Sequence, residues 1–221
     1  MSVQMWPTRS PVVRGVPRAL LLIALSWALL VSPATNVASN LFVDLIQTSM
    51  PTAIGIGGRG DPTSSNIQAK LNGTVVPPGY FYDPINYPAS IQLSASTAIS
   101  GPKVYNEILT KPTPTLVIGY SEGTLGAEFA KRQLLANGTG PAASQLSFIM
   151  IGSPFAGNGG IFERFPGISV PFIVDNMGPA APSAYDTTYY TREYDPYADF
   201  PAYFNPLTLA NSLLGVVYAH P

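Results

Sequence analysis

Residues 116–124 read Leu-Val-Ile-Gly-Tyr-Ser-Glu-Gly-Thr, and this stretch decides the fold. An apolar, β-branched run ends in Gly-x-Ser-x-Gly, and a helical pattern follows at once, from Gly123 to about Ala136. A strand that turns sharply into a helix at such a serine is a nucleophile elbow, in which the hydroxyl stands clear of the sheet. Strand and helix cross closely there, so small residues such as Gly119 and Gly123 are needed. We predict that Ser121 is a nucleophile; the alternative is a serine in an ordinary glycine-rich turn.

The composition sets limits on the class of protein. A chain of 221 residues suits a single domain with a sizeable core, and its few charged residues (10%) with 20 Gly and 23 Pro indicate a loop-rich, rather apolar globular protein. There is no basic run or RNA-binding motif, so we expect no nucleic-acid partner. The absence of cysteine excludes disulfides, a thiolate nucleophile and cysteine-held zinc. We expect a monomer with no metal and no cofactor.

Residues 1–38 have the pattern of a secretory signal. Three arginines (Arg9, Arg14 and Arg18) precede an apolar run of thirteen residues, 19–31, and small residues follow. The run is shorter than the roughly 20 residues that span a bilayer. We predict a signal peptide, or alternatively a retained N-terminal anchor, followed by one domain at 39–221. The domain would then be secreted or associated with the membrane or cell envelope.

The remaining chain alternates strands with helices, which predicts an α/β fold with a mostly parallel sheet flanked by helices. Residues 73–94, rich in Pro, Tyr and Asn, are predicted to be an irregular surface excursion. Residues 155–183, here called the late insertion, are apolar but without period. We expect the late insertion to cover an acyl-chain site; the alternative is a structural loop clamped on the core. The predicted strands are 52–56, 115–119, 146–152 and 187–194, and the predicted helices are 95–109, 123–136 and 205–218.

A glycine-rich loop, Gly57-Gly58-Arg59-Gly60-Asp61, follows the first predicted strand. In α/β-hydrolases one oxyanion-hole donor comes from a loop after an early strand and the other from the residue after the nucleophile. The candidate donors are therefore the backbone N–H groups of Gly58 or Arg59 and of Glu122. A plain glycine turn or a phosphate-binding loop is the alternative, although the latter lacks Gly-Lys-Ser/Thr. The Arg59 side chain could also pair with an acidic group of a substrate.

His220 is the only histidine in the chain. A serine nucleophile needs a neighbouring base, and an acid that orients this base. In α/β-hydrolases these residues occur in the order Ser, Asp or Glu, then His, with the acid in a loop after a late strand. Ser121, Asp195 and His220 follow that order. Asp199 is the alternative acid, and Asp175 and Asp186 are weaker candidates.

Several segments resemble the PE-PPE domain of mycobacteria and their relatives, a group of serine α/β-hydrolases similar to cutinases and lipases around the elbow. These segments are Gly-Tyr-Ser-Glu-Gly at 119–123, Gly-Gly at 57–58, NGGIFERFPG at 158–167, YTREYDPYADFP at 190–201 and the final YAHP. The resemblance extends from about Ala53 to the last residue. It implies a Ser-Asp-His triad, no metal, and activity on acyl esters.

Three functions are compatible with these features. The first is an exported esterase or lipase that cleaves acyl esters or lipids through an acyl-enzyme. The second is an acyltransferase that moves the acyl chain onto a cell-envelope glycolipid such as a trehalose ester. The third is a non-catalytic envelope protein on a hydrolase scaffold, which the order Ser, Asp, His disfavours.

Overall fold

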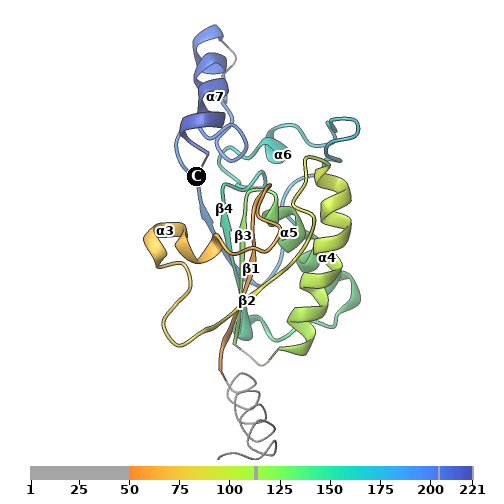
Figure 1. The fold of residues 1–221 in the computed structure, drawn as a ribbon. Coiled ribbons are helices and arrows are strands. Elements are labelled where there is room, and N and C mark those ends of the chain that lie inside the picture. Colours follow the sequence, from red (N-terminus) through yellow and green to blue (C-terminus); the bar gives the residue numbers. More distant parts are fainter. Residues whose placement is uncertain (1–49, 112–113, 204, 221) are drawn as a thin grey trace, which may run out of the picture. The chain divides into compact units, whose positions relative to one another are not determined.

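A sheet of five parallel strands forms the centre of the computed structural model, which describes residues 50–111, 114–203 and 205–220 (Figure 1). The predicted signal segment, residues 1–38, and residues 39–49 lie outside this part of the chain. The strand order is β2-β1-β3-β4-β5, and each neighbouring pair is parallel. The strands are β1 (Thr52–Ile56), β2 (Phe81–Pro84), β3 (Thr115–Tyr120), β4 (Leu146–Ile151) and β5 (Asp186–Tyr190).

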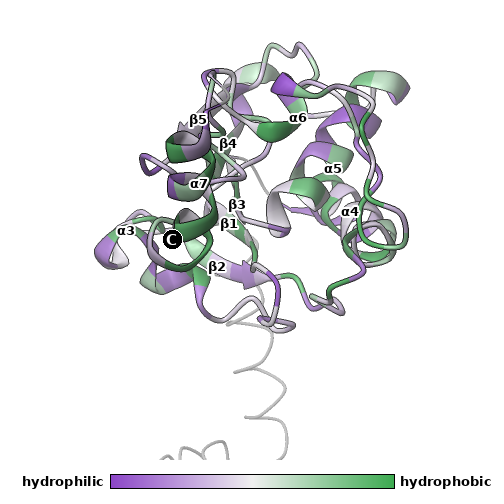
Figure 2. Cartoon of the chain, turned by 90° about the horizontal axis from the view of Figure 1, so that it is seen from above, coloured by the Kyte–Doolittle hydropathy of each residue, from purple (hydrophilic) through white to green (hydrophobic). Residues whose placement is uncertain are grey.

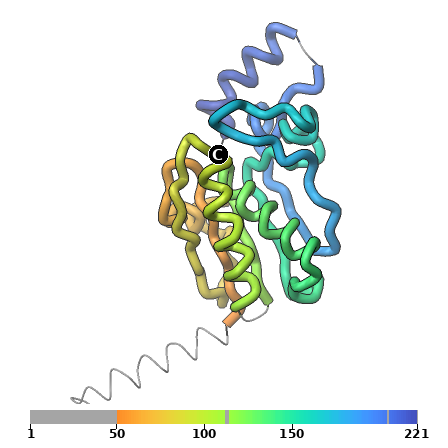
Figure 3. The backbone as a smooth tube through the Cα atoms, turned by 90° about the vertical axis from the view of Figure 1, so that its right-hand side faces the viewer, coloured from red at the N-terminus to blue at the C-terminus, as the bar shows by residue number. Residues whose placement is uncertain are grey.

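Helices cover both faces of the sheet. The long helices α4 (Leu93–Thr110) and α5 (Gly123–Asn137) lie side by side on one face (Figures 1 and 3). The short helices η1 (Ile67–Ala69) and α3 (Lys70–Gly73) lie on the other face. The remaining helices are η2 (Ala143–Gln145), α6 (Ile161–Arg164) and α7 (Pro206–Tyr218). None of the helices in the described ranges is long and apolar enough to cross a membrane.

Alternate side chains of the strands enter two separate apolar cores. Ile54, Val117 and Phe148 pack under α4 and α5, whereas Ala53 and Ile118 pack on the opposite face, around Ile67 of η1. Successive strand residues point to opposite faces, so a sheet that is covered on both sides needs strands that are apolar throughout. This requirement explains the unbroken apolar runs that predicted β1, β3 and β4.

The structure differs from the sequence-based prediction at residues 73–94, which are not irregular throughout. Phe81–Pro84 form β2, the edge strand, paired with Thr52–Gly55 of β1. A proline is tolerated here because an edge strand needs to donate hydrogen bonds on one side only. The last strand also ends at Tyr190 and not at Tyr194, whose φ of +66° is incompatible with a continuing strand.

The architecture is the α/β-hydrolase fold that the sequence predicts. The elbow segment connects β3 to α5, and the late insertion connects β4 to β5 with one short helix, α6. The carboxyl ends of all five strands lie at the same edge of the sheet, because all pairs are parallel. Ligand sites in open α/β sheets form at this edge.

Candidate active site

Ser121 occupies a strained turn between β3 and α5. Its φ is +51°, a left-handed conformation that is uncommon for residues other than glycine. Its backbone N–H donates to the carbonyl of Ile151 at 2.9 Å, which fixes the turn against the end of β4. The two motif glycines permit the crossing: a Cβ at Gly123 would lie 2.1 Å from the carbonyl oxygen of Ile56, and one at Gly119 would lie 3.0 Å from Thr124.

The structure brings Ser121, His220 and Asp195 together in one chain of hydrogen bonds. Ser121 Oγ lies 2.7 Å from His220 Nε2, and His220 Nδ1 lies 2.8 Å from Asp195 Oδ2. His220 follows Ser121 by 99 positions in the sequence. The Asp195 side chain is fully buried and that of His220 is 13% exposed, so bulk water screens this pair only weakly.

The loop after β5 distinguishes the two candidate acids. Asp195 turns one oxygen to His220, while its other oxygen, Oδ1, accepts the backbone N–H groups of Tyr197 (2.9 Å) and Ala198 (3.2 Å). Asp199 instead closes the loop: its Oδ2 accepts the backbone N–H of Tyr194 at 3.0 Å. The other two candidates also lie elsewhere, Asp175 in the late insertion and Asp186 at the start of β5.

Two tyrosine rings enclose the imidazole of His220. The Tyr120 ring stacks on it with centroids 5.6 Å apart, and the Tyr197 ring meets it edge-on at 4.8 Å. Gly152 lies beneath the ring, where a Cβ would come within 3.0 Å of His220 Cε1. None of these three contacts was predicted from the sequence, although Tyr120 belongs to the elbow motif itself.

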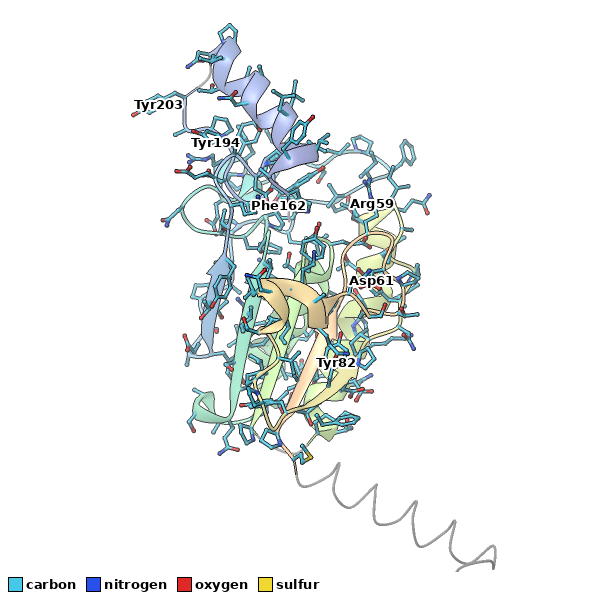
Figure 4. All side chains as sticks on the ribbon, turned by 60° about the vertical axis from the view of Figure 1, so that its left-hand side comes forward. Arg59, Asp61, Tyr82, Phe162, Tyr194 and Tyr203 are labelled. Carbon is cyan, nitrogen blue, oxygen red and sulfur yellow. The ribbon has the colours of Figure 1, made fainter. Side chains whose placement is uncertain are left out.

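The glycine-rich loop after β1 lies beside Ser121. A Cβ at Gly58 would lie 2.8 Å from the Tyr120 ring and 3.2 Å from Ser121 Cβ, so the Gly58 backbone approaches the elbow directly. Asp61 braces the loop by accepting the backbone N–H groups of Ser65 and Asn66. The Arg59 side chain is exposed and lines the cavity described below; in Figure 4 it lies at the same end of the molecule as Phe162.

Glu122 carries the most perturbed carboxyl group at the site. Only 4% of the residue is exposed, and this burial raises the pKa of the carboxyl from 4.5 to about 7. The Ser96 hydroxyl and the Arg59 guanidinium favour the ionised form, but burial outweighs both. From the sequence, only the backbone N–H of Glu122 was predicted to have a role at the site. That group precedes the first turn of α5, where N–H groups have no intrahelical acceptor.

An apolar cavity of about 550 Å³ opens onto Ser121 and His220. Much of its wall comes from the late insertion, including Phe162, Phe165 and Val174, and Val216 of α7 also contributes. The remaining lining residues include Arg59, Ile91, Leu93, Tyr120, Glu122, Leu125, Gly152, Pro154, Ile161, Ile168, Val170, Ile173, Asn176 and Tyr197. Figure 2 shows the hydrophobic residues that run along α7 at the strand ends. A site of this composition suits an aliphatic chain beside a reactive polar centre.

The late insertion is fastened to α5 by a charged network. Arg132 donates to the carbonyl oxygens of Met177 and Pro179, both at 2.6 Å. Glu128 is fully buried, pairs with Lys131 at 2.6 Å and accepts the backbone N–H of Ala181 at 2.7 Å. These contacts fix the position of the cavity wall. Within the described ranges, no cluster of three His, Asp or Glu residues could hold a metal ion.

Residues 70–221 match the PE-PPE domain. The chain belongs to the PE-PPE domain family. Among its relatives in Mycobacterium tuberculosis (strain ATCC 25618 / H37Rv), the protein named Esterase PE16 is 42% identical over 109 residues, which are 48% of this chain and 21% of that protein. PE family protein PE3 is 30% identical over 190 residues, covering 76% of this chain and 40% of that protein. The chain thus spans well under half the length of these PE-PPE relatives.

Two solved structures also resemble this PE-PPE chain, at lower sequence identity. An acetylxylan esterase is 21% identical with a TM-score of 0.45, covering 75% of this chain and 93% of that one. A Trichoderma reesei cutinase in complex with a C11Y4 phosphonate inhibitor is 15% identical with a TM-score of 0.39, covering 91% and 95%.

Proposed function

We propose that the protein is a carboxylic ester hydrolase that acts through Ser121, His220 and Asp195. The continuous hydrogen-bond chain of 2.7 Å and 2.8 Å through the only histidine carries this proposal. Two further observations agree with the proposal: the strained backbone of Ser121, and the name of one relative of the chain, Esterase PE16. A serine hydroxyl is a poor nucleophile by itself, and the geometry supplies the base that it needs.

The reaction follows from the roles of these groups. Ser121 Oγ attacks the ester carbonyl while His220 Nε2 accepts the hydroxyl proton, and Asp195 keeps the imidazole in the required tautomer and stabilises its charged form. The backbone N–H groups of Glu122 and of Gly58 or Arg59 stabilise the negative oxygen of the tetrahedral intermediate. His220 then passes its proton to the leaving alcohol, and an acyl-enzyme remains. Water, activated by the same imidazole, releases the acid.

The substrate is an ester with an aliphatic acyl chain. The apolar cavity reaches the nucleophile, and the late insertion contributes most of its apolar wall. Burial of each methylene group in such a wall contributes about 0.8 kcal/mol, so a chain that fills the cavity is favoured over acetate. The predicted signal at residues 1–38 supports a place of action outside the cytoplasmic membrane, and fractionation of cells that produce the full chain tests this part.

Hydrolysis of p-nitrophenyl esters by wild type and by Ser121→Ala tests the central claim. We expect turnover to fall to background in the variant, with unchanged far-UV circular dichroism. A fluorophosphonate probe followed by peptide mapping should label Ser121 alone. An inactive wild-type protein that takes no label would support the non-catalytic scaffold instead. Addition of trehalose to the assay separates the remaining two functions, because an acyltransferase would form acylated sugar and a hydrolase free acid.

A further inference from the structure

Gly215 lies where α7, the helix that precedes His220, touches the loop that carries Asp195, here called the acid loop. Ser212 and Gly215 are the buried residues of α7. A Cβ at Gly215 would lie 1.8 Å from the carbonyl oxygen of Tyr194 and 3.2 Å from Cδ of Pro196. These two residues flank Asp195, and Figure 4 shows Tyr194 beside α7. The backbone of the helix therefore rests directly on the acid loop, which only glycine permits.

The carbonyl of the same residue fixes the chain at His220. Gly215 O accepts the backbone N–H groups of Ala219 at 2.9 Å and of His220 at 2.8 Å. Gly215 thus touches the acid loop through its Cα and the histidine through its carbonyl. A shift of Gly215 would therefore change the position of His220 relative to the acid loop, and with it the hydrogen bond between the side chains of His220 and Asp195.

The acid loop is too well braced to yield to the helix. Tyr194 has a φ of +66°, and its N–H donates to Asp199 Oδ2 at 3.0 Å. The N–H of Asp199 in turn donates to the carbonyl of Asp195 at 2.7 Å. A strained backbone conformation persists only where its surroundings determine it strongly. A side chain at position 215 would consequently move α7 rather than the loop.

We propose that Gly215 is a positioning residue, which sets the imidazole of His220 in register with Asp195 and Ser121. This inference rests on the proposed Ser-His-Asp chemistry. Because Cβ contacts shorter than 3.0 Å essentially never occur, an alanine would open the contact with Tyr194 by at least about 1.2 Å, the difference between 3.0 and 1.8 Å. A displacement of this size, carried along the chain to His220, would lengthen hydrogen bonds of 2.7 and 2.8 Å beyond hydrogen-bonding range. A misplacement of about 1 Å can cost about 100-fold in rate.

Gly215→Ala in the full chain tests the proposal, with Gly157→Ala as the matched control because a Cβ at Gly157 meets no atom within 4 Å. We expect kcat on a p-nitrophenyl ester to fall about 100-fold in Gly215→Ala and to stay at the wild-type value in the control. His220→Ala and the double variant Gly215→Ala/His220→Ala show whether Gly215 acts through the histidine. Equal residual rates in these two support the proposal, whereas a further loss in the double variant overturns it.

The single histidine provides a readout that is independent of turnover. In a sample labelled with ¹⁵N-histidine, the Nδ1–H proton bonded to Asp195 should give a downfield resonance in wild type that disappears in Gly215→Ala. Retention of both this resonance and the wild-type kcat would refute the role of Gly215. If His220→Ala itself keeps full activity, the proposed function fails; if His220→Ala is inactive while Gly215→Ala is fully active, the positioning role alone fails.

A second variant covers the case in which Gly215→Ala does not fold. Asp199→Ala releases the N–H of Tyr194 and loosens the surface on which Gly215 rests. We expect about a tenfold loss of kcat and a weaker Nδ1–H resonance. The loss should vanish when His220 is already replaced by alanine. A loss that persists in that background would contradict transmission through the histidine.

Discussion

The buried carboxyl of Glu122 should make the free energy of unfolding fall as the pH rises, and Glu122→Gln should abolish this dependence. Because burial raises the pKa of this group from 4.5 to about 7, the folded protein favours the neutral form. The stabilisation that comes from keeping this carboxyl neutral in the fold is complete below pH 4.5. It declines as the pH rises towards 7 and is lost above that value. Glutamine has nearly the same shape and is neutral throughout, so the variant should not show this decline.

The expected size follows from the same two pKa values. One pKa unit is worth about 1.4 kcal/mol, so the difference between 4.5 and about 7 corresponds to at most about 3.5 kcal/mol. At about pH 8.5, Glu122→Gln should therefore exceed wild type by up to about 3.5 kcal/mol in the free energy of unfolding, and at about pH 5 by less than about 1 kcal/mol.

Urea unfolding at both pH values measures this difference. Far-UV circular dichroism is the suitable signal, because both tryptophans (Trp6 and Trp27) lie in the N-terminal segment. Glu193→Gln is the control, since this glutamate is exposed and should show the same difference from wild type at both pH values. If Glu122→Gln also differs from wild type by a constant amount, the burial argument is wrong.

Three further changes test separate parts of the site. Asp195→Asn should lower kcat by about 10³- to 10⁴-fold through the wrong imidazole tautomer, far more than the about tenfold loss in Asp199→Ala; similar losses in steady-state kinetics would contradict the assignment of the acid. Arg132→Met removes the hydrogen bonds to the carbonyls of Met177 and Pro179. It should reduce the preference for long over short p-nitrophenyl esters about threefold or more, while fluorophosphonate labelling persists. An unchanged chain-length profile would show that the late insertion does not determine this preference. Gly123→Ala should destabilise the fold by about 3 kcal/mol in thermal unfolding, because its Cβ would lie 2.1 Å from the Ile56 carbonyl oxygen. A wild-type midpoint would show that the elbow can open.

Local signals in the sequence account for the parts of the fold that were predicted. The apolar runs of β1, β3 and β4 reflect burial on both faces, and the elbow needs glycine at 119 and 123 for contacts that the structure contains. By contrast, β2 has only four residues and includes Pro84, so it carries almost no strand signal. Its pairing with β1 depends on the tertiary fold, which residue propensities do not encode.

The choice between Asp195 and Asp199 shows why a site is harder to predict than a fold. Both residues are aspartates in the same short loop, and the chain order of the roles fits either one. Their difference arises from the turn itself, in which the N–H groups of Tyr197 and Ala198 orient Asp195 while Asp199 binds Tyr194. The burial of the Glu122 side chain, which lies near Ser96 of α4, likewise depends on residues distant in sequence, so no local pattern predicts it.

The parallel arrangement of the strands has a practical consequence for coupling the protein to a support. Thr52 pairs with Thr115 at one edge of the sheet and Ile56 pairs with Gly119 at the other, two residues before Ser121. A strand of five residues spans about 15 Å, so the chain joins β1 at the edge remote from the nucleophile. A tether or solid support coupled at Met50 would therefore attach away from the cavity mouth and leave it open to bulky esters.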